Sequence, residues 1–446
     1  MKKYDSYKDS GIEWIGDIPE HWDLKKIKHT TYVKGRIGWQ GLRSEEFLEE
    51  AESLVVTGTD FIDGKINWKT CYQIPIERYN EDINIQLKEN DLLITKDGTI
   101  GKVSLVKNMP KIATLNSGVF LTRPSTNDYI TEYMYWVLVS EIFKTFYDFN
   151  KSGSTIQHLY QYVFNEFGFT KPSIKEQKII ASYLDHKTTQ IDTLISKKQQ
   201  FISLLQEERI AVINQSVTKG LDPKVKMKDS GIEWLGEIPE HWEIKRLKYL
   251  IYKKIDNRGK TPPFGEEGRP MLEVKQIIDN KIYPSEKFEK YSKNEDLVGY
   301  LRDEVEEGDV LIATVGATAG KCCIVPYNFE FFIAQNVIGF RCNKETDSLF
   351  FYYIIESTYF KDSLFKINKS NTIDNLKVSV FINNECIVPP LEEQKKLSKL
   401  ITDRNKMVNE TSKKLRKEIE LLEEYKTALI SEVVTGKVDV RNEKLN

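Results

Sequence analysis

The chain has 446 residues, enough for two to four domains, and its hydrophobic content of 40% is typical of a globular protein. A formal net charge of −2 argues against a protein that wraps nucleic acid unaided, because such proteins carry excess Lys and Arg to neutralise phosphates. The first residues lack the apolar core of a signal peptide, no run reaches the roughly 18 apolar residues that span a membrane, and the five cysteines lack metal-ligand spacing. We therefore expect a cytoplasmic protein with reduced thiols and no bound metal.

A segment of 21 residues occurs twice, 220 residues apart. KDSGIEWIGDIPEHWDLKKIK at Lys8–Lys28 and KDSGIEWLGEIPEHWEIKRLK at Lys228–Lys248 share 15 identical positions, and the other six exchange similar residues. Shorter matches follow, such as Asp91–Ile94 with Asp309–Ile312, each leading into a glycine turn. The chain is therefore a tandem duplication, and we expect two similar bodies related by a pseudo-twofold axis.

Each copy begins with a part of mixed α/β texture, over about residues 1–172 and 218–389. Short β-branched and aromatic runs alternate there with Gly, Pro, Asn and Asp, which is typical of strands and turns. Trp22 and Trp242 lie at matching positions among Ile and Pro residues, which favours a place in each core. We expect two globular domains of the same fold.

Each copy ends in a highly charged stretch, residues 173–217 and 390–435. From about residues 174 and 391 onward it lacks glycine and proline until its end, which predicts a long helix. Apolar residues recur every seven positions, which indicates a coiled-coil seam. Lys198 interrupts the first seam and either fixes the register or extends its ammonium group to solvent. The predicted seam consists of Leu184, Ile191, Lys198, Leu205 and Val212 in the first helix and Ile401, Val408, Leu415, Leu422 and Leu429 in the second.

The two helices most simply pair with each other in antiparallel orientation, since a parallel pair would crowd both domains together. About 42 residues at about 1.5 Å each give a spacer of at most roughly 60 Å. The expected fold class is α+β: two tandem-repeat globular α/β domains joined by two long helices that form an antiparallel coiled coil. Residues 436–446 are expected to form a C-terminal tail.

Several segments occur in a characteristic order: the opening GIEWIGDIPEHW, the glycine turn, a Pro-x-x-x-Glu-Gln entry to each helix (Pro172–Gln177 and Pro389–Gln394), and a Lys-Gly-Leu-Asp-Pro joint before the second copy. In this order the chain resembles, over essentially its whole length, the specificity subunit of type I DNA restriction–modification enzymes. The resemblance implies that each globular part is a target recognition domain that reads one half of an asymmetric, bipartite DNA site. It also implies that the helices set the spacing between the half-sites.

The resemblance further implies partners. Two methyltransferase (modification) subunits would dock on the helices and carry S-adenosylmethionine and the adenine-N6 chemistry. Restriction subunits that use ATP and magnesium would then join, and the chain itself would hold no cofactor and catalyse nothing. Such partners would supply much of the phosphate-binding surface, which accounts for the near-neutral charge of this chain.

Candidate contacts with double-stranded DNA lie in three places in the first copy. A basic, glycine-rich loop runs from Lys34 to Arg43 and is either a contact loop or a solvated one. Lys96 and Lys102 flank a glycine turn that suits a phosphate or a tight strand connection equally well. Residues 157 and 158 lie in a polar loop that contacts DNA or caps a helix. The candidates are Lys34, Arg36, Trp39, Gln40, Arg43, Lys96, Lys102, Gln157 and His158.

The second copy has a loop of the same kind, over residues 253–263, but with different residues. Such divergence within a duplicated loop is what reading two different half-sites requires, because Arg pairs with guanine and Asn or Gln with adenine. The candidates here are Lys254, Asn257, Arg258, Lys260 and Lys321.

Three segments resemble parts of enzymes. Thr261–Phe264 lacks the amide or carboxylate that an amino-methyltransferase motif needs, and Gly316–Cys322 has the wrong spacing and a cysteine where a phosphate loop has Ser or Thr. Asp256 with Glu273 and Lys275 could imitate a nuclease set. None of the three is repeated in the other copy, so we predict no catalytic residue. The rival hypotheses are an enzyme, which would turn over substrate alone, and a coiled-coil adaptor, which would not read DNA.

Overall fold

The computed structural model describes residues 2–36, 42–150, 158–232, 235–259, 261–278, 281–282, 288–316, 319–327, 329–333, 335–368 and 376–443. The chain divides into two compact units, one formed by Met1–Lys198 with Arg416–Asn446 and the other by Gln199–Leu415. Each unit therefore contains one globular domain and a part of both long helices. Within the described ranges, no helix combines the length and apolar character needed to cross a membrane.

The domain of the first unit is built around strand β9 (Leu92–Thr95). Leu92 and Ile94 point into the larger core, and Leu93 points into a second core on the other side of the sheet. Burial on both faces explains the unbroken apolar run of β9, because neither face meets water. The sheet has the order β4 (Thr31–Gly35), β12 (Val119–Pro124), β9, β10 (Val103–Leu105), β7 (Lys65–Ile66) and β6 (Phe61–Ile62).

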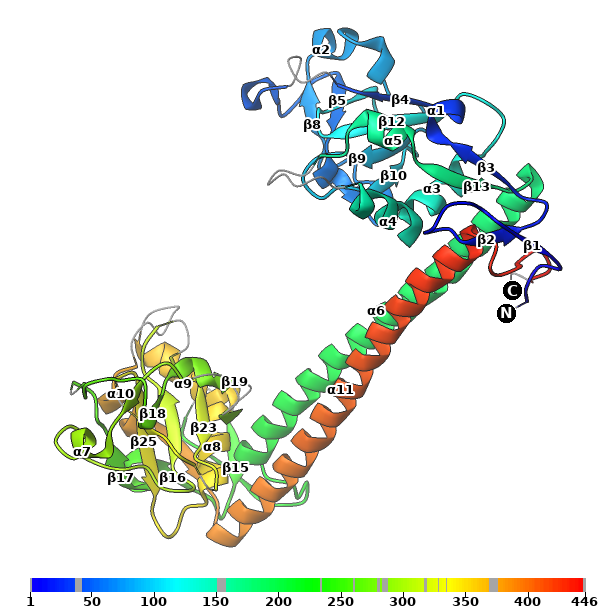
Figure 1. Ribbon diagram of the computed structural model, residues 1–446. Coiled ribbons are helices and arrows are strands. Elements are labelled where there is room, and N and C mark those ends of the chain that lie inside the picture. The colour runs from blue at the N-terminus through cyan, green and yellow to red at the C-terminus, as the bar shows by residue number, and fades with distance from the viewer. Residues whose placement is uncertain are drawn as a thin grey trace. The chain divides into compact units, whose positions relative to one another are not determined.

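Smaller sheets and short helices complete this domain (Figure 1). One sheet pairs β5 (Ser53–Val56) in parallel with β11 (Ala113–Leu115) and antiparallel with β8 (Tyr72–Ile74). Two further antiparallel pairs are β1 (Tyr7–Asp9) with β2 (Asp17–Pro19) and β3 (Asp23–Lys26) with β13 (Gly168–Lys171). The short helices are α1 (Ile27–Thr30), α2 (Ile76–Asn80), α3 (Thr131–Val139), α4 (Glu141–Phe149) and α5 (Gln161–Asn165).

The domain of the second unit repeats this plan. Its central strand β22 (Val310–Ala313) also has side chains in two cores, with Val310 and Ile312 in one and Leu311 in the other. The sheet order is β17 (Ile251–Ile255), β25 (Val337–Cys342), β22 and β23 (Cys322–Ile324), and a second sheet joins β21 (Tyr291–Ser292), β18 (Arg269–Leu272) and β24 (Phe332–Ile333). The other strand pairs are β14 (Met227–Asp229) with β15 (Glu237–Pro239), β16 (Glu243–Arg246) with β26 (Glu385–Val388), and β19 (Ile277–Ile278) with β20 (Lys281–Ile282). The short helices are α7 (Asn294–Leu297), α8 (Ser348–Glu356), α9 (Thr358–Asn368) and α10 (Val378–Asn383).

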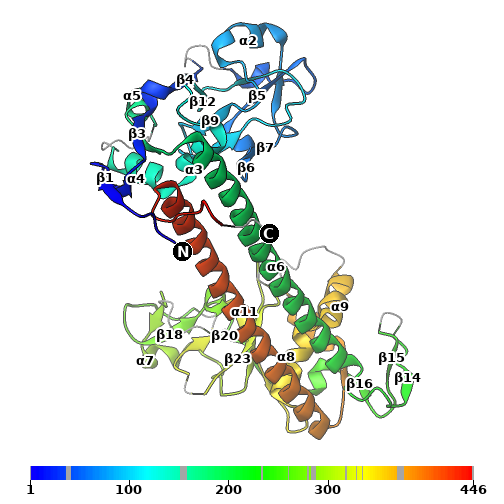
Figure 2. The same ribbon diagram turned by 90° about the vertical axis from the view of Figure 1, so that its right-hand side faces the viewer.

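The long helices α6 (Ile174–Thr218) and α11 (Leu391–Val434) pack together, as the heptad pattern predicts (Figures 1 and 2). In the first unit Lys426 pairs with Asp192 at 2.7 Å and Glu418 pairs with Lys198 at 2.5 Å, so residue numbers rise along one helix as they fall along the other. In the second unit Arg404 pairs with Glu208. The helices are therefore antiparallel in both units.

The seam residues differ in how far they are covered. Lys198 keeps 20% of its side-chain surface exposed and pairs with Glu418, so its ammonium group reaches the edge of the seam. The buried members are Leu184, Ile191, Ile401, Val408, Leu415 and Leu429, and the half-buried ones are Leu205, Val212 and Leu422.

Each helix is fixed to its domain by the same polar joint. In the first unit the Glu176 carboxylate accepts hydrogen bonds from the Trp22 indole at 3.3 Å and from His21 at 3.0 Å. In the second unit Glu393 accepts from the Trp242 indole at 3.1 Å and from His241 at 2.8 Å. Because both indoles are fully buried, the carboxylates satisfy donors that have no access to water.

The neighbouring glutamine completes the joint. The Gln177 side-chain oxygen accepts from the Ile130 main chain at 2.9 Å, and its amide donates to Pro172 at 3.0 Å. Gln394 makes the equivalent bonds to Asp347 at 2.9 Å and Pro389 at 2.9 Å. The repeated Pro-x-x-x-Glu-Gln motif is thus a fastening between helix and domain.

Residues 436–443 pack into the first domain, although the sequence predicts a tail over residues 436–446. Val438 and Val440 are buried in the main core of the first unit. The Asp439 amide donates to the Lys2 carbonyl at 2.8 Å, and the Tyr7 hydroxyl donates to the Gly436 carbonyl at 3.1 Å. The alternating valines give this segment an apolar face, and the amino-terminal residues cover it.

Candidate nucleic-acid interface

Three separate parts of the first copy meet around one cavity. Lys96 follows strand β9, Arg36 follows β4, and His158 precedes helix α5, yet all three line a cavity of about 550 Å³. The Lys96 ammonium group lies 5.0 Å from the centre of the Phe120 ring and makes no ion pair within the part of the chain that the structure describes. His158 is hydrogen-bonded to the Asp97 carboxylate at 2.5 Å. The cavity thus presents a cation, a carboxylate and an imidazole to the same volume.

An aromatic pair lies beside this cavity. The rings of Tyr160 and Tyr162 stack with their centres 5.5 Å apart, and the two residues are 54% and 70% exposed. His158 lies 6.0 Å from Tyr160. Stacked, exposed aromatic rings are costly in water and mark contact surfaces. We did not predict these tyrosines from the sequence, although their alternate spacing after His158 in a polar segment was a signal.

Arg36 is an interior residue. It is 2% exposed, its Nε donates to the Leu115 carbonyl at 2.8 Å, and its guanidinium lies 3.7 Å from Glu81. Burial, and then the nearby Arg78, lowers the pKa of Arg36. The sequence predicts that Arg36 contacts DNA, but in the structure Arg36 connects the end of β4 to β11 inside the domain.

The other candidates of the first copy are scattered. Lys34 is half-buried on β4, Lys102 is exposed at the end of the glycine turn, and Arg43 is exposed. Gly98 and Gly101 have φ values of +68° and +84°, which the turn between β9 and β10 requires. Trp39, Gln40 and Gln157, together with Lys260 of the second copy, lie outside the described residues.

In the second unit Asn257 is also interior, being 1% exposed. Its side-chain oxygen accepts from the Arg302 amide at 2.8 Å and the Asp303 amide at 3.2 Å, and its nitrogen donates to the carbonyls of Asp303 at 2.9 Å and Ile333 at 3.1 Å. The Asn257 side chain, which the sequence predicts to contact DNA, therefore forms these hydrogen bonds with the main chain. What it does is to fix the backbone at residues 302–303.

Arg258 and Lys254 share one carboxylate. The Arg258 guanidinium donates to both oxygens of Asp256, at 2.8 and 2.9 Å, and the Lys254 ammonium lies 3.5 Å from it. Hydrogen bonds from Arg258 hold the pKa of Asp256 down at about 2. Lys321 is exposed after the second glycine turn. The Asp256 carboxylate is therefore paired with two cations of its own domain.

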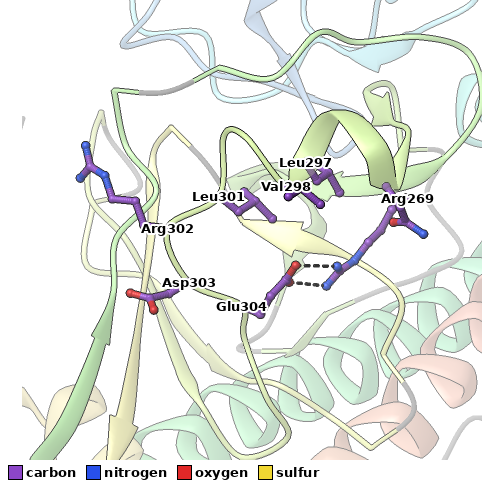
Figure 3. A pocket seen from close by; sticks show the side chains of 8 residues that line it. Arg269, Leu297, Val298, Leu301, Arg302, Asp303 and Glu304 are labelled. Carbon is purple, nitrogen blue, oxygen red and sulfur yellow. Dashed lines mark hydrogen bonds and ion pairs between the residues drawn. The ribbon is translucent and has the colours of Figure 1, made fainter.

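Arg302 was missed in the sequence because it opens an acidic run. Figure 3 shows Arg269 joined to Glu304 by hydrogen bonds of 3.0 and 2.8 Å, while the Arg302 side chain points away from both. Arg302 is exposed, and among the described residues its guanidinium has only a long contact of 3.4 Å, to the Asp256 carbonyl. This second cavity, of about 520 Å³, is lined by Arg269, Asn294, Leu297, Val298, Leu301, Arg302, Asp303 and Glu304.

The two carboxylates of the nuclease-like set each have their own ion-pair partners. Glu273 pairs with Lys290 at 2.6 Å and with Lys275 at 3.1 Å, apart from the Asp256–Arg258 pair. Within the same ranges, no group of three or more His, Cys, Asp or Glu side chains could hold a metal ion.

Comparison with known proteins shows the family. The model of the type I restriction modification DNA specificity domain matches residues 57–203 and 239–421, so the chain belongs to that family. It is therefore a DNA specificity subunit of the type I restriction–modification class, a non-catalytic subunit.

Relatives match along most of the chain. The type I restriction enzyme MjaVIII specificity subunit of Methanocaldococcus jannaschii is 25% identical over 439 residues, covering 95% of both chains. The EcoBI specificity subunit of Escherichia coli is 27% identical over 257 residues, covering 55% of this chain and 53% of its own.

Solved structures share the fold. A chain from work on complex assembly and conformational transition of the type I R-M system has a TM-score of 0.73 at 13% identity, covering 94% of this chain and 99% of its own. The HsdS subunit from Thermoanaerobacter tengcongensis has a TM-score of 0.58 at 13% identity, covering 94% and 98%.

Proposed function

We propose that this chain gives a type I restriction–modification complex its DNA sequence preference by reading a bipartite, asymmetric site, with one domain for each half-site. The observation that supports this best is the repetition of the fastening. Each central strand pairs antiparallel with the equivalent neighbouring strand, and both domains hold a long helix through a Trp–Glu hydrogen bond and a Gln side chain. A reader that must meet DNA at a fixed spacing needs such a stiff connection to its spacer.

The proposed DNA contacts lie on the globular domains. Phosphate contacts from lysines position a protein on the duplex, and side chains that reach base edges provide the sequence preference. The contact residues that we propose are Lys34, Arg43, Lys96, Lys102, His158, Tyr160 and Tyr162 in the first domain and Lys254, Arg258, Arg302 and Lys321 in the second. Trp39, Gln40, Gln157 and Lys260 remain predictions from the sequence.

The long helices are the proposed docking surface for two methyltransferase subunits. Along α11, Leu400 and Met407 are 40% and 48% exposed and lie seven residues apart, each one position before the seam. An apolar stripe beside a filled seam suits another helix packing alongside. Methyltransferase subunits would bring S-adenosylmethionine and the positive charge that this chain lacks, and restriction subunits would bring ATP and magnesium.

The central test is to express the chain with its cognate methyltransferase subunit and sequence the methylated adenines. We expect one asymmetric motif in two parts, separated by an unspecified gap, and no methylation by either protein alone. A continuous motif, or methylation by this chain alone, would contradict the proposal.

A substitution tests the docking surface. Met407→Asn should weaken capture of the methyltransferase subunit while leaving the melting temperature of the free chain unchanged, because this side chain is half exposed. Lys406→Asn, at the exposed neighbouring position, is the matched control and should leave capture intact. Equal capture by both variants would remove this stripe from the interface.

A further inference from the structure

The two domains hold one short segment in the same main-chain frame. In the first domain the Leu159 amide donates to the Lys96 carbonyl at 2.8 Å, and the Lys96 amide donates to Gly118 at 2.9 Å. In the second domain the Leu376 amide donates to the Thr314 carbonyl at 2.8 Å, and Thr314 donates to Asn336 at 2.8 Å. Lys96 and Thr314 therefore occupy equivalent positions, each directly after the central strand.

The side chains on this shared frame are unlike each other. Lys96 and Asp97 of the first domain correspond to Thr314 and Val315 of the second, and Tyr160 corresponds to Lys377. By contrast, the leucines that anchor the segment, Leu159 and Leu376, are both 1% exposed. The leucines that build the frame are kept, whereas the other three positions have diverged. In the second domain Val315 and Lys377 are exposed and Thr314 is buried. That contrast is not expected of surface drift alone, because in the first domain Lys96, Asp97 and Tyr160 all line one cavity.

We propose that these positions determine which base pair each domain reads, an inference that rests on the proposed function. In the first domain the Lys96 ammonium is a donor without an ion-pair partner in the described part of the chain, and the adjacent Asp97 carboxylate is an acceptor. A G·C pair offers the matching edge in the major groove, since guanine presents O6 and N7 as acceptors and cytosine presents an amino donor. The first half-site accordingly contains a G·C pair at this position.

The same frame in the second domain suits an A·T pair. Val315 is 40% exposed and offers an apolar contact for the thymine methyl group. The adjacent Thr314 is fully buried, and its hydroxyl donates to the Asn336 carbonyl at 3.0 Å, so Val315 is the side chain that faces the DNA. Neither residue is charged, whereas Lys96 and Asp97 at the equivalent positions of the first domain match the G·C edge. His158, held by Asp97, acts as a positioning residue because its hydrogen bond fixes the direction of that carboxylate.

The test uses the complete complex of this chain with its methyltransferase subunit. The double variant Lys96→Thr with Asp97→Val gives the first domain the side chains of the second. We expect methylation of the wild-type site to fall by about 10- to 100-fold, with one G·C position in one half-site relaxed or replaced by A·T. The reciprocal variant, Val315→Asp, leaves the buried Thr314 in place and should change one A·T position in the other half-site only.

Controls separate the possible failures. Lys69→Thr changes an exposed lysine of the same domain that does not line the cavity and should leave the motif unchanged. Melting temperatures of the variant chains within about 2 °C of the wild type exclude misfolding as a cause. His158→Asn, which keeps a hydrogen-bond donor, should preserve more activity than His158→Ala.

If the wild-type complex gives no two-part motif, the proposed function fails before any variant is compared. If the wild-type motif is present and both the Lys96/Asp97 double variant and Val315→Asp methylate it unchanged, this inference alone is overturned. A changed position that is A·T in the first half-site, or a change that falls in the wrong half-site, would overturn the assignment of bases.

Discussion

The joint between Trp22 and Glu176 predicts a difference between two matched substitutions. Glu176→Ala removes the acceptor of a fully buried indole N–H, which costs about 1–3 kcal/mol because the donor cannot turn to water. Glu176 also exchanges hydrogen bonds with Ser173 at the start of α6, at 3.3 and 3.4 Å, in a capping box. Losing that cap adds roughly 1 kcal/mol.

We therefore expect Glu176→Ala to destabilise the first unit by about 2–4 kcal/mol, or roughly 5–15 °C in melting temperature for a unit of this size. Glu393→Ala should cost less, about 1–3 kcal/mol, because Pro390 stands where Ser173 stands and α11 has no such cap. Glu392→Ala is the control, since the Glu392 side chain is 78% exposed.

Scanning calorimetry of the full chain measures all three. The pH dependence gives a second check: burial raises the pKa of Glu176, but hydrogen bonds from His21, Trp22 and Ser173 outweigh it, and the net pKa is lowered. A lowered folded pKa means that the contribution is present above the ordinary carboxyl range and is lost as pH falls through the folded value. The advantage of the wild type over Glu176→Gln should accordingly shrink in acid. Equal melting of Glu176→Ala and Glu392→Ala would refute this account of the joint.

Three further predictions concern the seam, the second domain and the spacer. Val408→Asp places a charge at a seam position that is 2% exposed, which costs several kcal/mol, and circular dichroism should show a markedly lower melting temperature. Arg302→Ala should lower binding of a DNA duplex by the complex about 5- to 150-fold in a competition assay, whereas Arg246→Ala, an exposed arginine on β16, should not. Adding four residues to both α6 and α11, a rise of about 6 Å, should lengthen the gap in the methylated motif and leave both half-sites unchanged.

The fold can be predicted from the sequence because its signals are local or repeated. The seven-residue spacing of Ile401, Val408 and Leu415 is enough to mark the buried side of α11, and all three side chains are buried. The duplicated Asp-hydrophobic runs likewise indicate two central strands. The division of both long helices between two compact units cannot be predicted in this way, because it depends on which residues distant in sequence complete each core.

The interface is harder to predict because the direction of a polar side chain depends on distant partners. Arg36 follows a strand in a basic, glycine-rich loop, so the sequence predicts an exposed side chain. In the structure a hydrogen bond to the Leu115 carbonyl holds it in the interior. Asn257 reads as a base contact, but main-chain groups some 45 and 76 residues away satisfy its amide. Arg302 precedes two acidic residues, so the sequence gives no sign of a DNA contact there. In the structure Asn257 fixes the main chain at Arg302, and the Arg302 side chain is exposed.

Tandem duplication offers a way to separate residues that hold the reader from residues that read. The Trp–Glu joint is kept in both copies, and breaking it would move a whole domain relative to its helix. Lys96 and Thr314 differ although the same hydrogen bonds hold their main chains. Neither residue takes part in the joint, so under the proposed function a substitution at this position should change the target of one domain without disturbing its fastening to the helix.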